Sequence, residues 1–301
     1  MDAISVNKLS KSYGNIKALR EISFEVRTGE LFGIIGPDGA GKTTLFRILT
    51  TLMLPEEGTA TVKGLDVVKD YKKIRRQVGY MPGRFSLYQD MTVEENLSFF
   101  ATLFGTTVQE NYDLVKDIYQ PLEKFKTRRA GKLSGGMKQK LALSCALIHK
   151  PSVLFLDEPT TGVDPVSRKD FWEMLGRLKK QGITIVVSTP YMDEAVLCDR
   201  IGLIREGQFM CIETPREIIN SYHEMLWAVH ADKMSTLLSE LRAFEGINSC
   251  FSFGDTLHIT VANEQLAPAT LKSFLEKKGH TDVEVYPIQA TIEDCYMLLA
   301  K

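Results

Sequence analysis

The stretch "GPDGAGKTT", residues 36–44, constrains the fold more than any other part of the chain. It fits the pattern G-x-x-x-x-G-K-[ST] and follows the apolar run "LFGII" directly. In such a loop, successive backbone N–H groups surround phosphate oxygens, and the next helix directs its positive end at them. The stretch therefore predicts an α/β fold with a phosphate-binding loop between a buried strand and a helix beginning near Lys42. The competing interpretation is a glycine-rich turn with a chance lysine.

We expect the whole loop to bind a nucleotide with Mg²⁺. Lys42 would hold the β- and γ-phosphates and Thr43 would place its hydroxyl on Mg²⁺. The candidate phosphate-binding residues are Gly36, Pro37, Asp38, Gly39, Ala40, Gly41, Lys42, Thr43 and Thr44.

A second stretch, "VLFLDEPTTGVD" at residues 153–164, ends an apolar strand with two carboxylates. Asp157 would be the second protein anchor of the cation. Glu158 stands where a carboxylate could orient and polarise an attacking water. Together with the phosphate loop, this strand predicts a nucleotide hydrolysis site in which Glu158 and Lys42 are the candidate catalytic residues.

A third stretch, "LSGGMKQK" at residues 133–140, opens a helix for which Ser134 is the expected N-cap. The backbone N–H groups of Gly135 and Gly136 could approach an anion closely. Head-to-tail packing of two chains would explain a second phosphate-binding helix start that is remote in sequence from the first. The Ser134 segment of one chain would then close over the γ-phosphate held by the other.

The remaining pattern predicts two domains, residues 1–220 and 221–301. Residues 1–30 and 59–64 alternate as antiparallel strands, whereas "LFGIIG", "VLFLD" and "ITIVVS" are the continuous apolar strands of a buried parallel sheet. Helical periodicity from about 85 to 150 indicates a helical subdomain. After residue 220 the order strand, helix, strand, strand, helix, strand fits a small α+β ferredoxin-like domain.

The charge balance excludes a broad electrostatic contact with nucleic acid, because the formal net charge is only −1. A transmembrane helix needs about 20 mostly apolar residues, and apolar runs such as "MLWAV" stop after five. The N-terminus also shows no charged region followed by an apolar run, so no signal peptide is expected. We therefore expect a cytoplasmic protein that reaches a membrane only through a partner.

These motifs, in this order, resemble those of the ATP-binding subunit of an ABC transporter over roughly residues 1–220. The resemblance implies ATP and Mg²⁺ as cofactors and a second ATP-binding subunit as partner. It implies that Tyr13 stacks on adenine, although a core-facing tyrosine is the alternative, and that Asp164 acts across the dimer. It also implies that helical residues near 85–88 form the groove for a coupling helix of a membrane subunit.

The chain departs from this family at two positions. Gly83 stands where the family usually has a Gln, and Pro190 stands where a His normally bonds the γ-phosphate. Glycine has no side-chain oxygen, and proline lacks even the backbone donor. We expect ATP binding to persist while the chain's own site turns over slowly, so that Ser134 serves a stronger site in a heterodimer. The alternative is a homodimer in which both sites work and the two substitutions are tolerated.

The stretches "YMPGRFSLYQDMTVEENL" and "STPYMDEAVLCDRI" resemble the ATPases that work with ABC-2 type permeases, which export drugs, lipids or polysaccharides. The resemblance places the chain on the inner face of the cell membrane, held by a permease. Two alternatives remain. One is a non-transport ABC ATPase acting on ribosomes or DNA repair substrates, and the other is an ATP-gated regulator that senses through residues 221–301.

Overall fold

The computed structural model describes residues 2–262 and 266–300. The chain forms two compact units that divide between Pro215 and Arg216. The expected division into domains at residue 220 stays a prediction.

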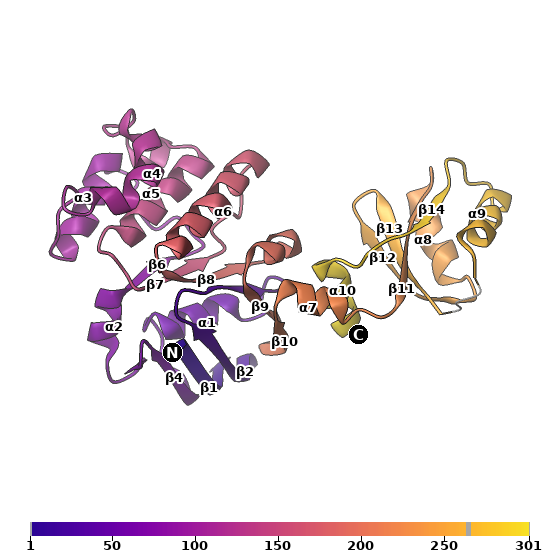
Figure 1. The fold of residues 1–301 in the computed structure, drawn as a ribbon, viewed down its shortest axis with the longest axis horizontal. Helices are drawn as coiled ribbons and strands as arrows, with labels where there is room; N and C mark the ends of the chain where they lie inside the picture. Colours follow the sequence, from indigo (N-terminus) through magenta and orange to yellow (C-terminus); the bar gives the residue numbers. More distant parts are fainter. Residues whose placement is uncertain (1, 263–265, 301) are drawn as a thin grey trace. The chain divides into compact units, whose positions relative to one another are not determined.

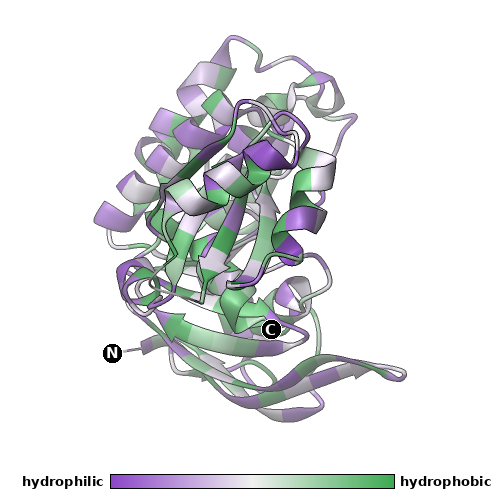
Figure 2. Ribbon diagram, turned by 90° about the vertical axis from the view of Figure 1, so that its right-hand side faces the viewer, coloured by the Kyte–Doolittle hydropathy of each residue, from purple (hydrophilic) through white to green (hydrophobic). Residues whose placement is uncertain are grey.

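The first unit is built on a six-stranded sheet of order β10-β9-β3-β8-β7-β6 (Figure 1). All strands are parallel except β10, which pairs antiparallel with β9. β3, β7 and β8 are buried along their whole length, as expected for a parallel sheet with both faces covered. In Figure 2 hydrophobic residues are frequent in the strands, whereas the helices on the outside carry both hydrophilic and hydrophobic residues. The strands are β3 (Leu31–Ile35), β6 (Val78–Met81), β7 (Val153–Asp157), β8 (Thr184–Thr189), β9 (Arg200–Arg205) and β10 (Gln208–Glu213).

A second sheet of the same unit has the order β2-β1-β4-β5 and is antiparallel throughout, which confirms the expected N-terminal pattern. One core cluster joins both sheets to helix α1 (Lys42–Leu49), so the helix that follows the phosphate loop is fixed by packing. Within this cluster the rings of Phe46 and Phe155 lie 5.7 Å apart, edge to face. The strands are β1 (Asp2–Tyr13), β2 (Ile16–Arg27), β4 (Glu57–Val62) and β5 (Leu65–Asp66).

Helices α3, α4 and α5 pack together as the expected helical subdomain (Figure 1). Thr92 begins α3 with a capping box, since its hydroxyl accepts from the N–H of Glu95 while the Glu95 carboxylate accepts from the N–H of Thr92. The helices of this unit are α2 (Tyr71–Gln77), α3 (Val93–Leu103), α4 (Tyr112–Glu123), α5 (Gly135–Leu147) and α6 (Pro165–Lys180), with 3₁₀ turns η1 (Ala130–Lys132) and η2 (Met192–Leu197).

One expectation about this region is wrong, because residues 85–88 are not helical but form a loop between β6 and α3. The buried side chain of Asn96 holds the loop instead: its Oδ1 accepts from the N–H of Tyr88 and its Nδ2 donates to the carbonyl of Tyr88, each at 3.0 Å. A backbone whose N–H and C=O are satisfied by a side chain needs no helix.

The second unit has the order β11, α8, β12, β13, α9, β14, in an antiparallel sheet arranged β12-β13-β11-β14. This confirms the βαββαβ order expected from the sequence. Helices α8 and α9 cover one face of the sheet and form the unit's core with it. The elements are α7 (Pro215–Asn220), β11 (Met225–His230), α8 (Met234–Arg242), β12 (Ile247–Phe253), β13 (Thr256–Val261), α9 (Pro268–Lys277), β14 (Glu284–Pro287) and α10 (Ile292–Leu299). Across both units, none of the described helices is long and apolar enough to cross a bilayer.

Candidate functional site

The phosphate loop lies between β3 and α1, and α1 begins at Lys42 as expected. The Lys42 side chain is only 3% exposed because it folds back into the loop, where Nζ donates to the carbonyls of Gly36 (2.8 Å) and Pro37 (3.0 Å). Glycine is required at two positions: a Cβ on Gly36 would stand 2.2 Å from the Ile204 carbonyl, and Gly41 has a φ of +105°. The loop is thus a fixed cradle around an ammonium group.

The side chain of Tyr13 lies beside this loop, next to Thr44 and Met53. Tyr13, at the end of β1, is 44% exposed, which argues against a core-facing role. Its hydroxyl lies 3.4 Å from the hydroxyl of Thr44 and donates to the sulfur of Met53 at 3.1 Å. The side chain is therefore partly exposed beside the loop, and its stacking on adenine stays a prediction.

The two carboxylates of "LDEP" lie at the end of β7. The hydroxyl of Ser188 on β8 donates to Asp157 Oδ1 at 2.7 Å, so the buried Asp157 carboxylate is held in one orientation. Glu158 takes a left-handed backbone conformation, with φ of +50°, and its N–H donates to the carbonyl of Ser188 at 3.0 Å. The Glu158 carboxylate reaches Lys42 Nζ at 3.1 Å. The fold therefore brings Lys42, Asp157 and Glu158 together at the carboxyl ends of β3 and β7, the two parallel strands on either side of β8, where ligands of such sheets bind.

Both departures from the family pattern lie beside this cluster. A Cβ on Gly83 would stand 3.0 Å from the carbonyl oxygen of Asp157 and 3.7 Å from the Cβ of Glu158. Pro190 follows β8 directly, and the preceding residue, Thr189, accepts at its carbonyl from the N–H of Gly36 at 3.3 Å. Neither position offers a side-chain hydrogen-bond donor to the site.

The Ser134 motif lies elsewhere on the same unit. Ser134 caps α5, its hydroxyl accepting from the N–H of Met137 at 3.5 Å, and both Ser134 and Gly135 are exposed. Gly136 packs on α6, where an added Cβ would meet the Ser167 hydroxyl at 2.7 Å. Figure 1 shows α5 well apart from α1, so within one chain this exposed helix start does not meet the phosphate loop.

Asp164, the last residue of the segment 159–164, caps α6 by accepting from the N–H of Ser167 at 3.0 Å. This backbone hydrogen bond lowers the pKa of the exposed Asp164 carboxyl below its usual value, so the residue is ionised at neutral pH. Its action across a dimer stays a prediction.

The comparisons agree with this geometry. A model of the ABC transporter family matches residues 19–161. The chain is 36% identical over 300 residues to the Nod factor export ATP-binding protein I of Burkholderia lata, covering 98% of this chain and 96% of that protein. The chain belongs to the ABC transporter ATP-binding family.

Two further members of the family are similar over its ATP-binding part. The probable multidrug ABC transporter ATP-binding protein YbhF of Escherichia coli is 40% identical over 217 residues, which are 71% of this chain but only 38% of YbhF. A dimeric ATP-binding cassette, solved in a post-hydrolysis state with ADP and Pi, superposes with a TM-score of 0.65 at 26% identity, over 70% of this chain and 98% of that one. This chain thus spans well under half the length of YbhF.

Sequence reasoning missed two residues of this ABC site, Ser188 and Glu194. Ser188 orients both Asp157 and Glu158, and Glu194 accepts hydrogen bonds from Thr160 and Thr189. The signal for Ser188 was a polar residue at the carboxyl end of an otherwise apolar parallel strand, the position at which such sheets place functional groups. Glu194 gave no such signal, because its burial depends on how two distant loops meet.

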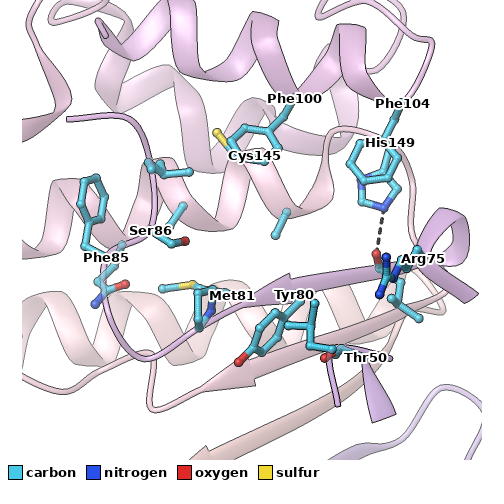
Figure 3. A pocket seen from close by; sticks show the side chains of 17 residues that line it. Thr50, Arg75, Tyr80, Met81, Phe85, Ser86, Phe100, Phe104, Cys145 and His149 are labelled. Atoms are coloured by element: carbon cyan, nitrogen blue, oxygen red, sulfur yellow. Dashed lines mark hydrogen bonds between the residues drawn. The ribbon is translucent and has the colours of Figure 1, made fainter. Parts of the chain in front are cut away.

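A groove of about 370 Å³ lies between β6 and the helices α3 and α5 (Figure 3). Phe85 and Met81 lie at one end of the view, and the stacked rings of His149 and Phe104, 3.8 Å apart, at the other. Burial lowers the pKa of His149, so its ring is neutral at pH 7 and the wall stays apolar. The loop residues Phe85, Ser86 and Leu87 line this groove, while Tyr88 is not among its lining residues, and a coupling helix in the groove stays a prediction.

Proposed function

We propose that this chain binds Mg-ATP and powers an ABC-2 type membrane exporter by closing on a second ATP-binding subunit. The observation that carries the proposal is the pairing of Lys42 with Glu158 beside the buried Asp157. Such a cluster supplies a phosphate ligand, a carboxylate for water and a cation anchor at a single strand edge.

The residues present fit ATP and Mg²⁺. The exposed backbone of Pro37, Asp38 and Gly39 can receive phosphate oxygens, and nothing would meet a Cβ within 4 Å of Gly39, so the cradle is open there. Lys42 lies at the floor of the cradle and can exchange Glu158 for a phosphate. The hydroxyl of Thr43 and the carboxylate of Asp157 are the hard oxygen ligands that Mg²⁺ prefers. When bound, the cation neutralises charge on the phosphates.

We also propose that this chain's own site hydrolyses ATP slowly. Gly83 lies beside Asp157 and Pro190 lies near Gly36, and neither residue has a polar side chain. Loss of one positioned polar group that acts on the transition state costs about 10²- to 10³-fold in rate. The test is Mg-ATP hydrolysis by the purified chain beside its Glu158→Gln variant, with nucleotide binding measured separately. Tight binding with background turnover supports the proposal. Turnover of several per second that disappears in the variant would instead favour a homodimer with two working sites.

The second subunit would carry the Gln and His that this chain lacks. The exposed Ser134 helix start of this chain would then complete the partner's site. Mixing this chain with such a subunit should give hydrolysis faster than the sum of the two parts. The effect should disappear when Ser134 is replaced by Arg, whose side chain would fill the space over the partner's phosphate. A rate that equals the sum would contradict heterodimer formation.

We place the permease contact at the aromatic groove between β6, α3 and α5, which puts the chain on the inner face of the membrane. Burying aromatic and aliphatic surface is the main source of affinity in such a groove. Phe100 lines it, whereas the adjacent Phe99 does not. With the permease in membranes, Phe100→Ala should weaken co-purification and Phe99→Ala should not. Equal effects, or recovery with ribosomes rather than membranes, would contradict this placement.

The names of the relatives support an export direction, since they refer to Nod factor export, doxorubicin resistance and multidrug transport. The cargoes in these names share no narrow chemistry. We therefore propose export and assign the choice of substrate to the permease.

A further inference from the structure

A carboxylate that the proposed hydrolysis does not use is buried beside the site. Glu194, in η2, is 2% exposed. Its Oε2 accepts from the hydroxyl of Thr189 at 2.5 Å, and its Oε1 accepts from the hydroxyl of Thr160 at 2.7 Å. Both threonines are buried as well. One carboxylate thus joins two segments that lie far apart in the sequence.

The surrounding groups satisfy the charge of this carboxylate. Arg168 Nε lies 3.6 Å from Glu194 Oε1, and the Arg168 guanidinium stacks over the Tyr191 ring at 4.1 Å. The N–H of Tyr191 in turn donates to the Thr189 hydroxyl at 3.1 Å. Arg168 Nε makes no hydrogen bond, so it offsets the charge of Glu194 as an ion pair, and the two threonine hydroxyls supply the hydrogen bonds to the carboxylate.

Each threonine belongs to a segment with a role in the proposed reaction. Thr189 ends β8, and its carbonyl accepts from the N–H of Gly36 at the start of the phosphate loop. Thr160 is the second residue of the segment 159–164, which ends at Asp164, the residue expected to act across the dimer. A buried hydrogen-bonded connection therefore runs from Gly36 through Thr189 and Glu194 to Thr160.

We propose that Glu194 is a positioning residue that couples the ATP site to the segment 159–164, and so to the neighbouring subunit. This rests on the proposed function, since it assumes that ATP binds at residues 36–44. Pro190 removes a side-chain route from the end of β8 to the nucleotide. The buried connection through Thr189 and Thr160 remains, and through it the segment 159–164 responds to the phosphate loop.

The variants Thr160→Val and Thr189→Val test the coupling, because valine keeps the branched shape, removes only the hydroxyl and leaves the Glu194 charge in place. Thr184→Val is the matched control: Thr184 is also fully buried on β8, and its hydroxyl accepts from the N–H of Gly29 at 2.9 Å. The measurement is hydrogen–deuterium exchange of the full chain with and without Mg²⁺ and a non-hydrolysable ATP analogue.

In the unmodified chain the analogue should slow exchange in residues 36–44 and in residues 159–164. Thr160→Val and Thr189→Val should keep the slowing of exchange in residues 36–44. Each should reduce the slowing in residues 159–164 by about fivefold or more, and the double variant should reduce it no further than either single variant. The Thr184→Val control should keep both effects. In turnover assays with the complementing subunit, kcat should fall while KM is unchanged.

The coupling is refuted if residues 159–164 stay protected in both single variants, or if Thr184→Val loses the protection to the same extent. The coupling is also refuted if the double variant loses as much protection as the two single variants together, because hydroxyls that act independently would give additive losses. Absence of protection at residues 36–44 in the unmodified chain would overturn the proposed function itself and the coupling with it.

Discussion

Replacing Glu158 with Gln should make the chain bind ATP more tightly. The Glu158 carboxylate lies 3.1 Å from Lys42 Nζ, the group that is expected to hold the phosphates. ATP must displace this contact and bring its own negative charge close to the carboxylate. A neutral amide of the same shape removes both costs.

The size of the effect follows from the burial of the pair. Lys42 is 3% exposed and Glu158 23% exposed, so the pair lies between an exposed ion pair, worth about 0–1 kcal/mol, and a buried charge-assisted hydrogen bond, worth about 1.5–3 kcal/mol. An intermediate value of about 1.4 kcal/mol corresponds to a tenfold lower Kd. The φ of residue 158 is +50°, and we expect the same backbone strain in the variant because Glu and Gln have the same side-chain shape.

The assay is titration with Mg-ATP by calorimetry at fixed salt, comparing the unmodified chain with Glu158→Gln. Glu276→Gln serves as the control: its carboxylate forms an ion pair with Lys272 at 3.9 Å in the second unit, so the net charge changes equally. We expect about tenfold tighter binding for Glu158→Gln and no change for the control. Equal or weaker binding in Glu158→Gln would refute the idea that this carboxylate competes with phosphate.

Three further predictions concern the loop, a surface helix and the second unit. Gly36→Ala should weaken ATP binding and destabilise the chain by about 1–3 kcal/mol, because its Cβ would stand 2.2 Å from the carbonyl of Ile204; urea unfolding and ATP titration measure both effects. Gly176→Ala, inside α6 with no atom within 4 Å of the new Cβ, should instead stabilise by about 0.5–1 kcal/mol in the same urea assay. Asp294→Asn should destabilise at pH 7, because hydrogen bonds from His258 and Thr291 outweigh desolvation and lower the pKa of the Asp294 carboxyl. A lowered folded-state pKa contributes stability above the unfolded-state pKa of about 4, so the difference from the unmodified chain should shrink as pH falls below 4 in pH-dependent urea unfolding.

Most of the fold could be predicted because its signals are local. The apolar runs predicted as strands at residues 31–36, 153–157 and 183–188 contain most of the buried strands β3, β7 and β8, and the alternating segments near the N-terminus became an antiparallel sheet. Residues 85–88 show where local reasoning fails: Asn96, eight positions after Tyr88, replaces helical hydrogen bonds with its own amide. The hydrogen bonds of the buried Asn96 side chain depend on the packing of α3, so they leave no periodic pattern in the sequence.

The sequence by itself determined the chemistry that any fold of this chain must serve. Glycines at positions 36, 39 and 41, a lysine and a strand that ends in two carboxylates predict phosphate and cation ligands, because each signal needs only neighbouring residues. The tertiary structure alone decided how these groups are held. It brought Ser188 against Asp157, Glu158 onto Lys42, and Glu194 between Thr160 and Thr189. Those contacts exist because parallel strands distant in sequence end at one edge of a sheet, a juxtaposition that only the packed core creates.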